Sequence, residues 1–509
     1  MSILTTLATR DDQINLFFPL ILLSFLIFII FKKHISPKAP PLPPGPYAWP
    51  IIGNIIQMGD NAHVTLAKLA QLHGPLMSLR FGAQHIVVGS SPEAAKGILK
   101  INDRLLSGRY VSNPLRVKGS KIHNLNLGFY DECDGGWKSL RAIYRTEVFS
   151  AKVMESQEEL REKKVTEMVE YLGSKEGQVV KVKEMVFACA LNILSNAFLS
   201  MDFMDFEGKG VGEGMYQNIR SYSQMGAVPQ LSDFFPILGG WDFQSFYKKL
   251  MTIYDRICGV WVDTVKERRQ RRDGSSTRRD FTDALIGIGF SDEQINPLLV
   301  ELFGAGTEST SATTEWALTE LIRNQEAMEK VRNELAEVIG SGTVTESNLC
   351  HLPYLEACVK ETLRLHPPGP LLLPHRATQT CEVMGYTIPK DSQVLVNVWA
   401  IARDPAIWDD PLSFKPERFL KSGLDYMGIN FEYLPFGSGR RMCPGQPLVS
   451  RVVPLILASL VHHFDWILPG NVKPSEIDMN DNLDVTMLKK EPMRVIPRIR
   501  KQLKTDQHF

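Results

Sequence analysis

The stretch PFGSGRRMCPGQ, from Pro435 to Gln446, decides the fold. It places one cysteine, Cys443, among three glycines and two arginines. The next residues, PLVSRVVPLILASLVHHF, have the pattern of a helix, so the cysteine would stand just before a helix N-terminus. Free N–H groups and the helix dipole favour a thiolate at such a position. The alternative is an ordinary core thiol in a glycine-rich turn.

A thiolate in this setting suggests an iron ligand. Cysteine thiolate is a soft metal ligand, and as an axial haem ligand it favours O–O cleavage. Phe436 can shield the sulfur from water, and Arg441 can reach a haem propionate. Gly439 and Gly445 would let the backbone lie close to a flat macrocycle, because they have no Cβ.

Composition limits the other classes of function. The chain has 509 residues, of which 44% are hydrophobic and 22% charged, as in a globular protein with a large core. Lys+Arg and Asp+Glu both number 57, so no overall basic field favours nucleic-acid binding. The seven cysteines are scattered and lack zinc-site spacing. They indicate a reducing compartment without a disulfide framework.

An apolar run, INLFFPLILLSFLIFIIF, occupies residues 14–31. As a helix it would measure roughly 27 Å, enough for a thin bilayer such as the endoplasmic reticulum. Lys32 and Lys33 follow it, so the positive-inside rule places the rest of the chain in the cytosol. A cleaved signal peptide and a buried core helix are the alternatives; the run has no small-residue cleavage site and is apolar all round.

The chain therefore divides into four expected segments. Residues 1–13 form a short lumenal N-terminus, 14–31 a single transmembrane anchor, 32–50 a proline-rich hinge and 51–509 the catalytic body. Length alone would allow two to four domains, but no second change in composition divides the body.

The body is predicted to be mainly α with a small β region. The run from Leu76 to Gly89 predicts a hairpin around Gly82, and Ser91 followed by proline predicts a helix start. Residues 136–364 favour helix almost throughout, with 156–173 and 313–340 as the clearest stretches. A β-leaning region follows around residues 386–401.

The motif at the cysteine resembles a known family. Phe436, Gly439, Arg441, Cys443 and Gly445 fit F-x-x-G-x-R-x-C-x-G, which is similar to the haem-binding signature of the cytochrome P450 monooxygenases. The resemblance implies the P450 fold, a triangular and mainly α body. It also implies haem b with an axial thiolate from Cys443, O2 as co-substrate, and electrons from NADPH through a membrane-bound P450 reductase.

Three further blocks extend this resemblance in the expected order. KETLR and PERF supply Glu361, Arg364 and Arg418, which the family joins in a buried structural ion-pair triad. FGAGTESTS supplies Glu308 and Ser309, where the family has an acid and usually a threonine that relay protons to dioxygen. Serine keeps the hydroxyl but loses the methyl group, which favours an atypical outcome such as rearrangement or phenol coupling.

The third block and one more motif concern the propionates. WKSLR supplies Trp137 and Arg141, one helical turn apart, and LLLPHRA supplies His375. The resemblance implies that all three residues contact the haem propionates. A surface patch is also expected to dock the reductase, and it comprises Lys138, Arg145 and Arg440.

Two further stretches, residues 381–420 and 424–437, resemble plant microsomal enzymes of alkaloid pathways. That group contains N-methylcoclaurine 3'-hydroxylase, berbamunine synthase and the littorine-rearranging enzyme. The expected reaction is hydroxylation of a benzylisoquinoline or tropane alkaloid, with rearrangement or coupling as the alternative. A haem sensor or electron carrier without catalysis is a third hypothesis. The resemblance places the pocket at 111–130, 299–305, 371–373 and 485–488, with Glu301 or Asp484 as a partner for the substrate amine.

Overall fold

The computed structural model describes residues 40–59, 61–112, 122, 124–227, 230–238, 245–270 and 280–500. The expected lumenal segment, the transmembrane segment 14–31 and the start of the hinge lie outside these residues. Among the described residues, one helix is long and apolar enough to cross a membrane, α9 (Val182–Leu199), and 83% of it is buried inside the protein. That burial is typical of a core helix.

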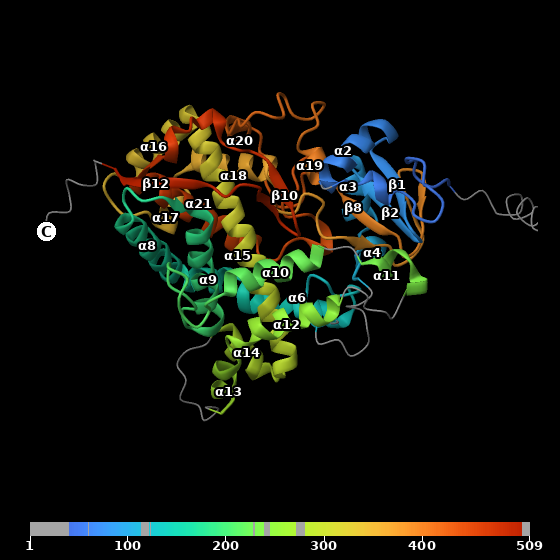
Figure 1. Ribbon diagram of the computed structural model, residues 1–509, viewed down its shortest axis with the longest axis horizontal. Helices are drawn as coiled ribbons and strands as arrows, with labels where there is room; N and C mark the ends of the chain where they lie inside the picture. Colours follow the sequence, from blue (N-terminus) through green and yellow to red (C-terminus); the bar gives the residue numbers. More distant parts are fainter. Residues whose placement is uncertain are drawn as a thin grey trace, which may run out of the picture.

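Helices dominate the described chain, and α15 (Asp292–Arg323) runs through its middle (Figure 1). Ser291 and Gln294 form a capping box at the N-terminus of α15. The remaining α-helices are α2 (Ala62–His73), α3 (Pro92–Lys96), α4 (Asp103–Leu106), α6 (Gly135–Ile143), α7 (Ala151–Ser156), α8 (Glu158–Ser174), α9, α10 (Met215–Ala227), α11 (Leu231–Phe234), α12 (Phe246–Gly259), α13 (Val262–Gln270), α14 (Phe281–Ile288), α16 (Gln325–Val338), α17 (Glu346–Leu349), α18 (Pro353–Leu365), α19 (Val398–Ile401), α20 (Glu417–Lys421) and α21 (Gln446–His463).

Short 3-10 and π turns connect several of these helices. They are η1 (Ile55–Gln57), η2 (Gly97–Ile101), η3 (Tyr144–Val148), η4 (Pro236–Leu238), η5 (Gly439–Arg441), η6 (Pro469–Asn471) and η7 (Pro474–Glu476).

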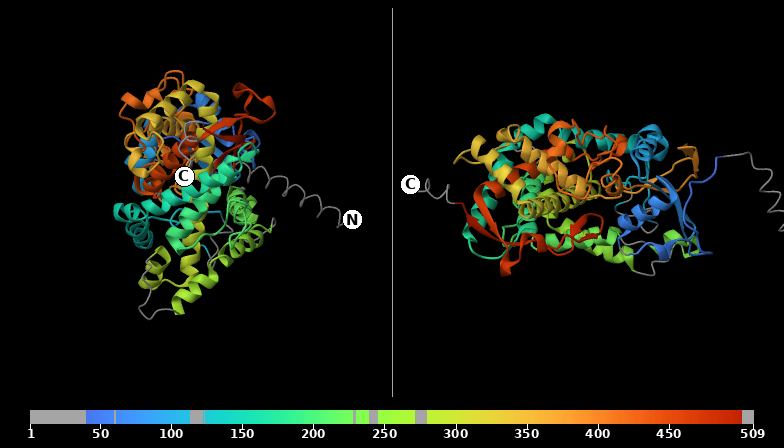
Figure 2. Two further views of the ribbon diagram at one scale, coloured as in Figure 1. Left: turned by 90° about the vertical axis from the view of Figure 1, so that its left-hand side faces the viewer. Right: turned by 90° about the horizontal axis from the view of Figure 1, so that it is seen from above.

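The β structure is small and divided into four sheets. One has five strands in the order β1-β2-β8-β5-β3, one has three in the order β4-β12-β9, and β10-β11 and β6-β7 are pairs. The five-stranded sheet lies at one end of the molecule (Figure 2). The strands are β1 (Leu76–Phe81), β2 (Gln84–Gly89), β3 (Gly108–Arg109), β4 (Val180–Lys181), β5 (His375–Arg376), β6 (Cys381–Val383), β7 (Tyr386–Ile388), β8 (Gln393–Val396), β9 (Phe464–Ile467), β10 (Asp481–Leu483), β11 (Met487–Lys489) and β12 (Arg494–Ile499).

The largest core cluster lies between α8, α9, α15, α16, α18 and α21. Its α15 members, Ala317, Leu318, Leu321 and Ile322, recur at the three- and four-residue spacing of one helix face. A second cluster packs the N-terminal half of α15 against α9, α12 and α14. Because both faces of α15 are packed, its position in the molecule is fixed along most of its length.

The predicted hairpin and the mainly helical middle of the chain are confirmed, but two expected helices are divided. The stretch 156–173 is broken at Gln157, between α7 and α8. The stretch 313–340 is broken at Asn324, where φ is −106° and ψ is 78°. The carbonyl of Glu320 accepts both the backbone N–H of Asn324 at 2.9 Å and its side-chain amide at 2.8 Å, which closes the end of α15. The apolar periodicity of the sequence continues across Asn324, so the sequence pattern did not reveal the break.

Candidate functional site

Cys443 lies in the loop between η5 and α21, at the start of a helix as predicted. Its backbone N–H donates to the carbonyl of Phe436 at 3.0 Å, which closes the loop. Burial raises the pKa of the Cys443 thiol, whereas the backbone N–H of Gly445, the guanidinium of Arg141 and the N–H of Gln446 lower it. The chain thus surrounds this sulfur with donors and positive charge that favour its ionised form.

The two glycines of the loop have different surroundings. Gly439 has φ +69°, and a Cβ there would lie 2.2 Å from the carbonyl oxygen of Leu99. The protein backbone alone therefore requires glycine at position 439, and close approach to a macrocycle is not needed to explain this residue. At Gly445 a Cβ would make ordinary contacts with the Cys443 sulfur at 3.8 Å and with Phe149 at 3.9 Å.

Phe436 packs beside the cysteine loop as part of the protein core. It is partly buried against the largest hydrophobic cluster, and its ring meets the edge of Tyr426 at a centroid distance of 5.4 Å. The ring is therefore held in place by the protein rather than free in solvent.

A basic cluster lies next to this loop. Arg441 donates from Nε to the carbonyl of Ser107 at 2.9 Å and from a terminal nitrogen to that of Leu127 at 3.0 Å. The guanidinium also lies over the ring of Trp137, 5.1 Å from its centroid, and Trp137 Nε1 donates to Leu127 at 3.2 Å. The structure therefore brings Arg441 and Trp137 together, as sequence reasoning expected.

Two neighbouring strands bring His375 into the same cluster together with a residue that sequence analysis missed. In the register of β3 and β5, Arg109 faces His375. His375 Nδ1 lies 2.7 Å from the carbonyl of Leu106, and burial together with Arg109 holds its pKa well below the usual value. Arg109 itself is 3% exposed and donates to the carbonyls of Gly128 and Leu373, both at 2.9 Å.

This cluster carries more positive than negative charge. Burial, and then Arg441, lower the pKa of Arg109 to about 9, and burial lowers the pKa of Arg441. In the described part of the chain, neither guanidinium has an ion pair at contact distance, and the oxygens that accept from them are neutral carbonyls. Glu301 and Cys133 nevertheless lie near enough to raise the pKa of both against the effect of burial. Arg141 is held near the sulfur of Cys443, which raises the pKa of Arg141 against the effect of burial. Buried charge needs a counter-charge, so this donor set fits the two carboxylates of a haem group.

Glu308 and Ser309 stand on different faces of α15, because neighbouring helical residues are about 100° apart. Burial raises the pKa of Glu308, while Lys183 on α9 and the Ser223 hydroxyl on α10 lower it. The Ser309 hydroxyl donates instead to the carbonyl of Ala305 at 2.6 Å, on the open face of the helix. The acid and the alcohol are adjacent in sequence, but their contacts lie in different directions.

Glu301, about two turns earlier on α15, holds the loop that contains residues 127 and 128. Its carboxylate accepts the backbone N–H of Leu127 at 2.8 Å and that of Gly128, and it accepts the Tyr144 hydroxyl at 2.9 Å. A Cβ at Gly128 would approach this carboxylate to 2.7 Å, so a larger residue there would require the Glu301 side chain to shift. Three donors therefore already hold this carboxylate in place, which leaves it less available to a substrate amine than the sequence suggested.

Asp484, the other candidate for the amine, lies in the turn between β10 and β11. It is partly buried, and its carboxylate accepts a hydrogen bond from Gln224 on α10 at 3.3 Å. The described residues supply no ion pair to it at direct contact distance. Of the expected pocket segments, Leu299 and Phe303 instead pack into the core, whereas Ala305 is on the open face.

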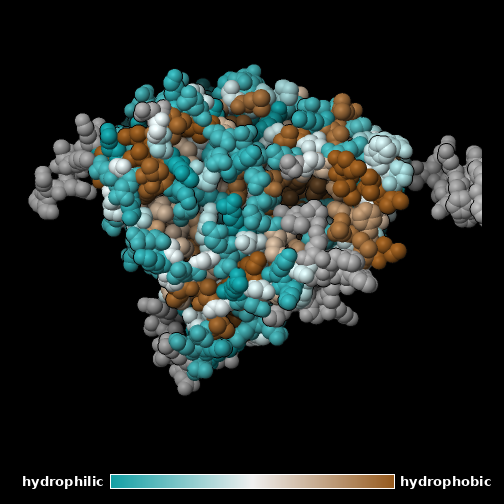
Figure 3. All heavy atoms as spheres, viewed as in Figure 1, coloured by the Kyte–Doolittle hydropathy of each residue, from teal (hydrophilic) through white to brown (hydrophobic). Residues whose placement is uncertain are grey.

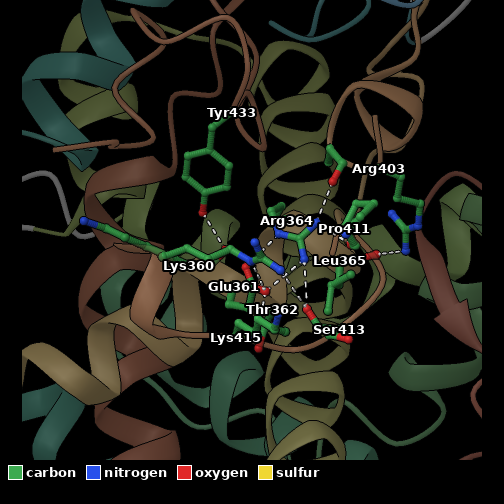
Figure 4. Close-up of polar contacts among 12 residues, drawn as sticks. Lys360, Glu361, Thr362, Arg364, Leu365, Arg403, Pro411, Ser413, Lys415 and Tyr433 are labelled. Atoms are coloured by element: carbon green, nitrogen blue, oxygen red, sulfur yellow. Dashed lines mark hydrogen bonds and ion pairs between the residues drawn. The ribbon is translucent and has the colours of Figure 1, made fainter. Parts of the chain in front are cut away.

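Glu361, Arg364 and Arg418 come together at α18. Figure 4 shows Glu361 and Arg364 with their polar contacts. Arg364 contacts both oxygens of Glu361, at 2.7 and 2.8 Å, and both side chains are fully buried. Arg418 Nε lies 3.2 Å from Glu361. Arg364 also donates to the carbonyls of Ala402 and Pro411, at 2.6 and 2.8 Å. The triad therefore ties α18 to the loops that follow it.

The three residues of the expected reductase patch are all exposed. Lys138 lies on α6 and Arg145 follows in η3. Arg440 belongs to η5 and pairs with Asp103 at 2.7 Å, so part of its charge is already compensated. The patch is thus weaker than the sequence alone suggested.

Comparison with known proteins identifies the family. The sequence model of the family described as Cytochrome P450 matches residues 43–496. The chain is 49% identical to a probable (S)-N-methylcoclaurine 3'-hydroxylase isozyme 2 of Coptis japonica, over 94% of this chain and 97% of that one. It is 46% identical to corytuberine synthase of the same plant, over 96% and 100%. It is 40% identical to berbamunine synthase of Berberis stolonifera, over 96% and 100%. The chain belongs to the cytochrome P450 family.

Proposed function

We propose that this P450 hydroxylates a benzylisoquinoline or tropane alkaloid. Membership of the family makes it an oxidoreductase with a haem-thiolate centre, which uses O2 and electrons from NADPH delivered by a reductase. The observation that carries the substrate class is its 49% identity to a probable N-methylcoclaurine hydroxylase over nearly the whole chain. A thiolate-bound haem would supply the activation of O2. The residues of this chain would hold the haem and bind the substrate.

Each residue has a distinct role in this proposal. Cys443 would bind the iron, and the N–H groups at the start of α21 lower the pKa of its thiol against the larger effect of burial. The propionate carboxylates would take the free donor capacity of the basic cluster, which comprises Arg109, Arg141, His375 and Arg441. Trp137 belongs to the same cluster, but its single N–H is bound to the carbonyl of Leu127, so it would contribute through its ring beneath Arg441. This arrangement satisfies the excess of buried positive charge described above.

Proton delivery is assigned to Glu308 and Ser309. Glu308 faces the buried Lys183, and Ser309 carries a hydroxyl on the open face of α15. Because the carboxylate of Glu308 is raised in pKa by burial, it can hold a proton nearer neutral pH than an exposed glutamate. A rotation of one of the two side chains, or a water, would have to connect them.

The substrate would be recognised by apolar contacts and one charge. Both alkaloid classes carry a basic amine, and Asp484, next to the expected pocket segment 485–488, has no ion pair at contact distance among the described residues. An amine bound there would gain a charge-assisted contact in a partly buried setting. Glu301 is less available for this contact, because three donors already hold its carboxylate.

The second candidate function is oxidative coupling or rearrangement without net oxygen insertion. Two relatives are named for synthases, corytuberine synthase and berbamunine synthase. Ser309 in place of the usual threonine also favours an atypical outcome. We further propose that residues 14–31 anchor the protein in the endoplasmic reticulum, with the catalytic body in the cytosol beside its reductase.

A binding screen tests the substrate class. Purified holoprotein is titrated with benzylisoquinoline and tropane alkaloids, and substrate binding is read from the shift of the haem spectrum. Each ligand that binds is then incubated with NADPH, reductase and labelled dioxygen. A product that contains one labelled oxygen supports hydroxylation, and an oxidised product without label supports coupling or rearrangement. Absence of binding by both alkaloid classes would refute the proposed substrate class.

A further inference from the structure

An exposed apolar surface lies at the end of the molecule that carries β1 and β2. Figure 3 shows hydrophobic residues gathered there. We call five of these exposed side chains the apolar rim: Tyr47, Trp49, Ile51, Ile56 and Ile237. Ile51 is 75% exposed and Ile237 is 91% exposed, values unusual for isoleucine in water. Contiguous exposed apolar surface of this kind marks a contact with a protein or a membrane.

A groove of about 390 Å³ opens within this surface. The β1–β2 turn forms one wall and the segment from α11 to η4 forms the other, and the lining includes Ile51, Phe234 and Ile237. The walls are fixed to each other, because Ala83 donates to the carbonyl of Phe234 at 2.8 Å. The rings of Phe81 and Phe234 also meet edge to face at 5.6 Å. The groove is therefore a built feature of the fold.

Two basic side chains also line this apolar groove. Arg80 and His85 are paired in the register of β1 and β2. In the described part of the chain, the guanidinium of Arg80 has no hydrogen-bond or ion-pair partner, and its Nε is buried. Burial and the charge of Arg80 lower the pKa of His85. Among the described residues, no acid forms an ion pair with either side chain. The groove thus combines apolar walls with an uncompensated positive charge.

The path of the chain indicates what this surface faces. Residues 40–51 run along β1, where Ser78 donates to the carbonyls of Pro43 and Pro44. They end in the apolar rim, and the 39 residues before them contain the apolar run 14–31. If that run enters a bilayer, as proposed above, the rim is held close to the same bilayer.

We propose that this groove binds one anionic phospholipid of the membrane. The phosphate and the acidic headgroup would contact Arg80, and an acyl chain would lie between Ile51 and Ile237. Anionic lipids suit this position because a basic side chain at a membrane surface gains about 1 kcal/mol, equal to roughly a five-fold preference. The inference rests on the proposed membrane location, and it is independent of the alkaloid substrate.

Photocrosslinking tests the site in the full-length holoprotein. The protein is placed in nanodiscs that contain a diazirine-labelled phosphatidylserine, or the same label on phosphatidylcholine, and the labelled peptides are identified by mass spectrometry. We expect the serine lipid to label the groove peptides, residues 47–51, 80–85 and 230–238, about five-fold more than the choline lipid. Excess unlabelled phosphatidylserine should compete, and inorganic phosphate should not.

Arg80→Gln should lower serine-lipid labelling to the choline level. The matched control is Arg498→Gln, on β12 at the far end of the molecule, and it should leave the preference unchanged. The reduced, carbon-monoxide-bound spectrum shows that each variant is folded. Should Arg80→Gln fail to fold, Ile237→Ser is used instead, and it should reduce labelling by both lipids.

Three results would overturn the proposal. One is equal labelling of the groove by both lipids. Another is retention of the serine-lipid preference in folded Arg80→Gln, or of full labelling in Ile237→Ser. The third is loss of labelling with inorganic phosphate, because the site would then bind a free anion. Failure of the alkaloid screen leaves these outcomes unaffected, since labelling requires no substrate.

Discussion

Replacing Glu361 by glutamine is the sharpest test of how the triad supports the site. The carboxylate binds Arg364 through two contacts, Arg418 through one, and the backbone N–H of Lys415 at 2.8 Å. Glutamine keeps the shape and removes the charge, so the fully buried guanidinium of Arg364 loses its counter-charge. Breaking a buried pair in this way costs about 3–5 kcal/mol, a large part of a typical stability of roughly 5–15 kcal/mol.

This cost converts into a measurable shift of the melting temperature. An unfolding entropy of about 2.1 cal/mol/K per residue, over a body of roughly 450 residues, gives about 0.9 kcal/mol/K. Glu361→Gln should therefore lower Tm by about 3–5 °C in differential scanning calorimetry of the holoprotein. The half-life of the carbon-monoxide spectrum at elevated temperature should fall in parallel.

A matched control removes the same charge from an exposed pair. Glu326 is 83% exposed and contacts Lys330 at 2.7 Å, one helical turn away. Glu326→Gln should cost less than about 0.5 kcal/mol and leave Tm within about 1 °C of the parent. If Glu361→Gln also stays within about 1 °C, the buried triad does not stabilise the fold as argued.

Four further predictions concern the centre and its surroundings. Cys443→Ser should abolish the reduced, carbon-monoxide-bound Soret signature, and an unchanged spectrum would disprove the assigned ligand. Ser309→Ala should raise peroxide formed per NADPH consumed, whereas Ser309→Thr should lower it; full coupling in the alanine variant would contradict the relay. Arg109→Leu should speed haem loss to apomyoglobin by about 10- to 100-fold, the equivalent of one charge-assisted contact, and unchanged loss would exclude a propionate role. Burial lowers the pKa of His462 to about 4, so stability should fall by about 3 kcal/mol as pH drops from 6.5 to 4, because the unfolded state takes up the proton first. His462→Gln should flatten this part of the pH profile of unfolding, and an identical profile would refute the assignment.

Much of the fold follows from patterns that are local in sequence. The β1–β2 hairpin, the Ser91 cap of α3 and the start of α21 were predicted because each depends on neighbouring residues. The Ser91 side chain does accept the N–H of Ala94, at 3.2 Å. The break at Asn324 was missed because it depends on how α15 and α16 pack in three dimensions, and apolar spacing does not record that.

The candidate site divides in the same way. Cys443, Arg441 and the E-x-x-R pair have fixed spacing in the chain, so a motif reveals them. Arg109 has no such spacing, and it enters the site only because β3 pairs with β5 across more than 260 residues of sequence. The hydrogen bonds that the Glu301 carboxylate accepts were equally hidden, since two of their donors are backbone N–H groups, which any sequence possesses.

The hydrogen bonds between Glu301 and the loop at residues 127 and 128 limit how this loop can change among related enzymes. The Glu301 carboxylate contacts main-chain donors of residues 127 and 128, together with one tyrosine hydroxyl. Side chains elsewhere in that loop can therefore be exchanged without undoing its attachment, whereas inserting or deleting a residue beside position 128 would shift the anchoring donors. Engineers who graft substrate-determining loops between relatives should keep this register and the small residue at 128, and vary the rest.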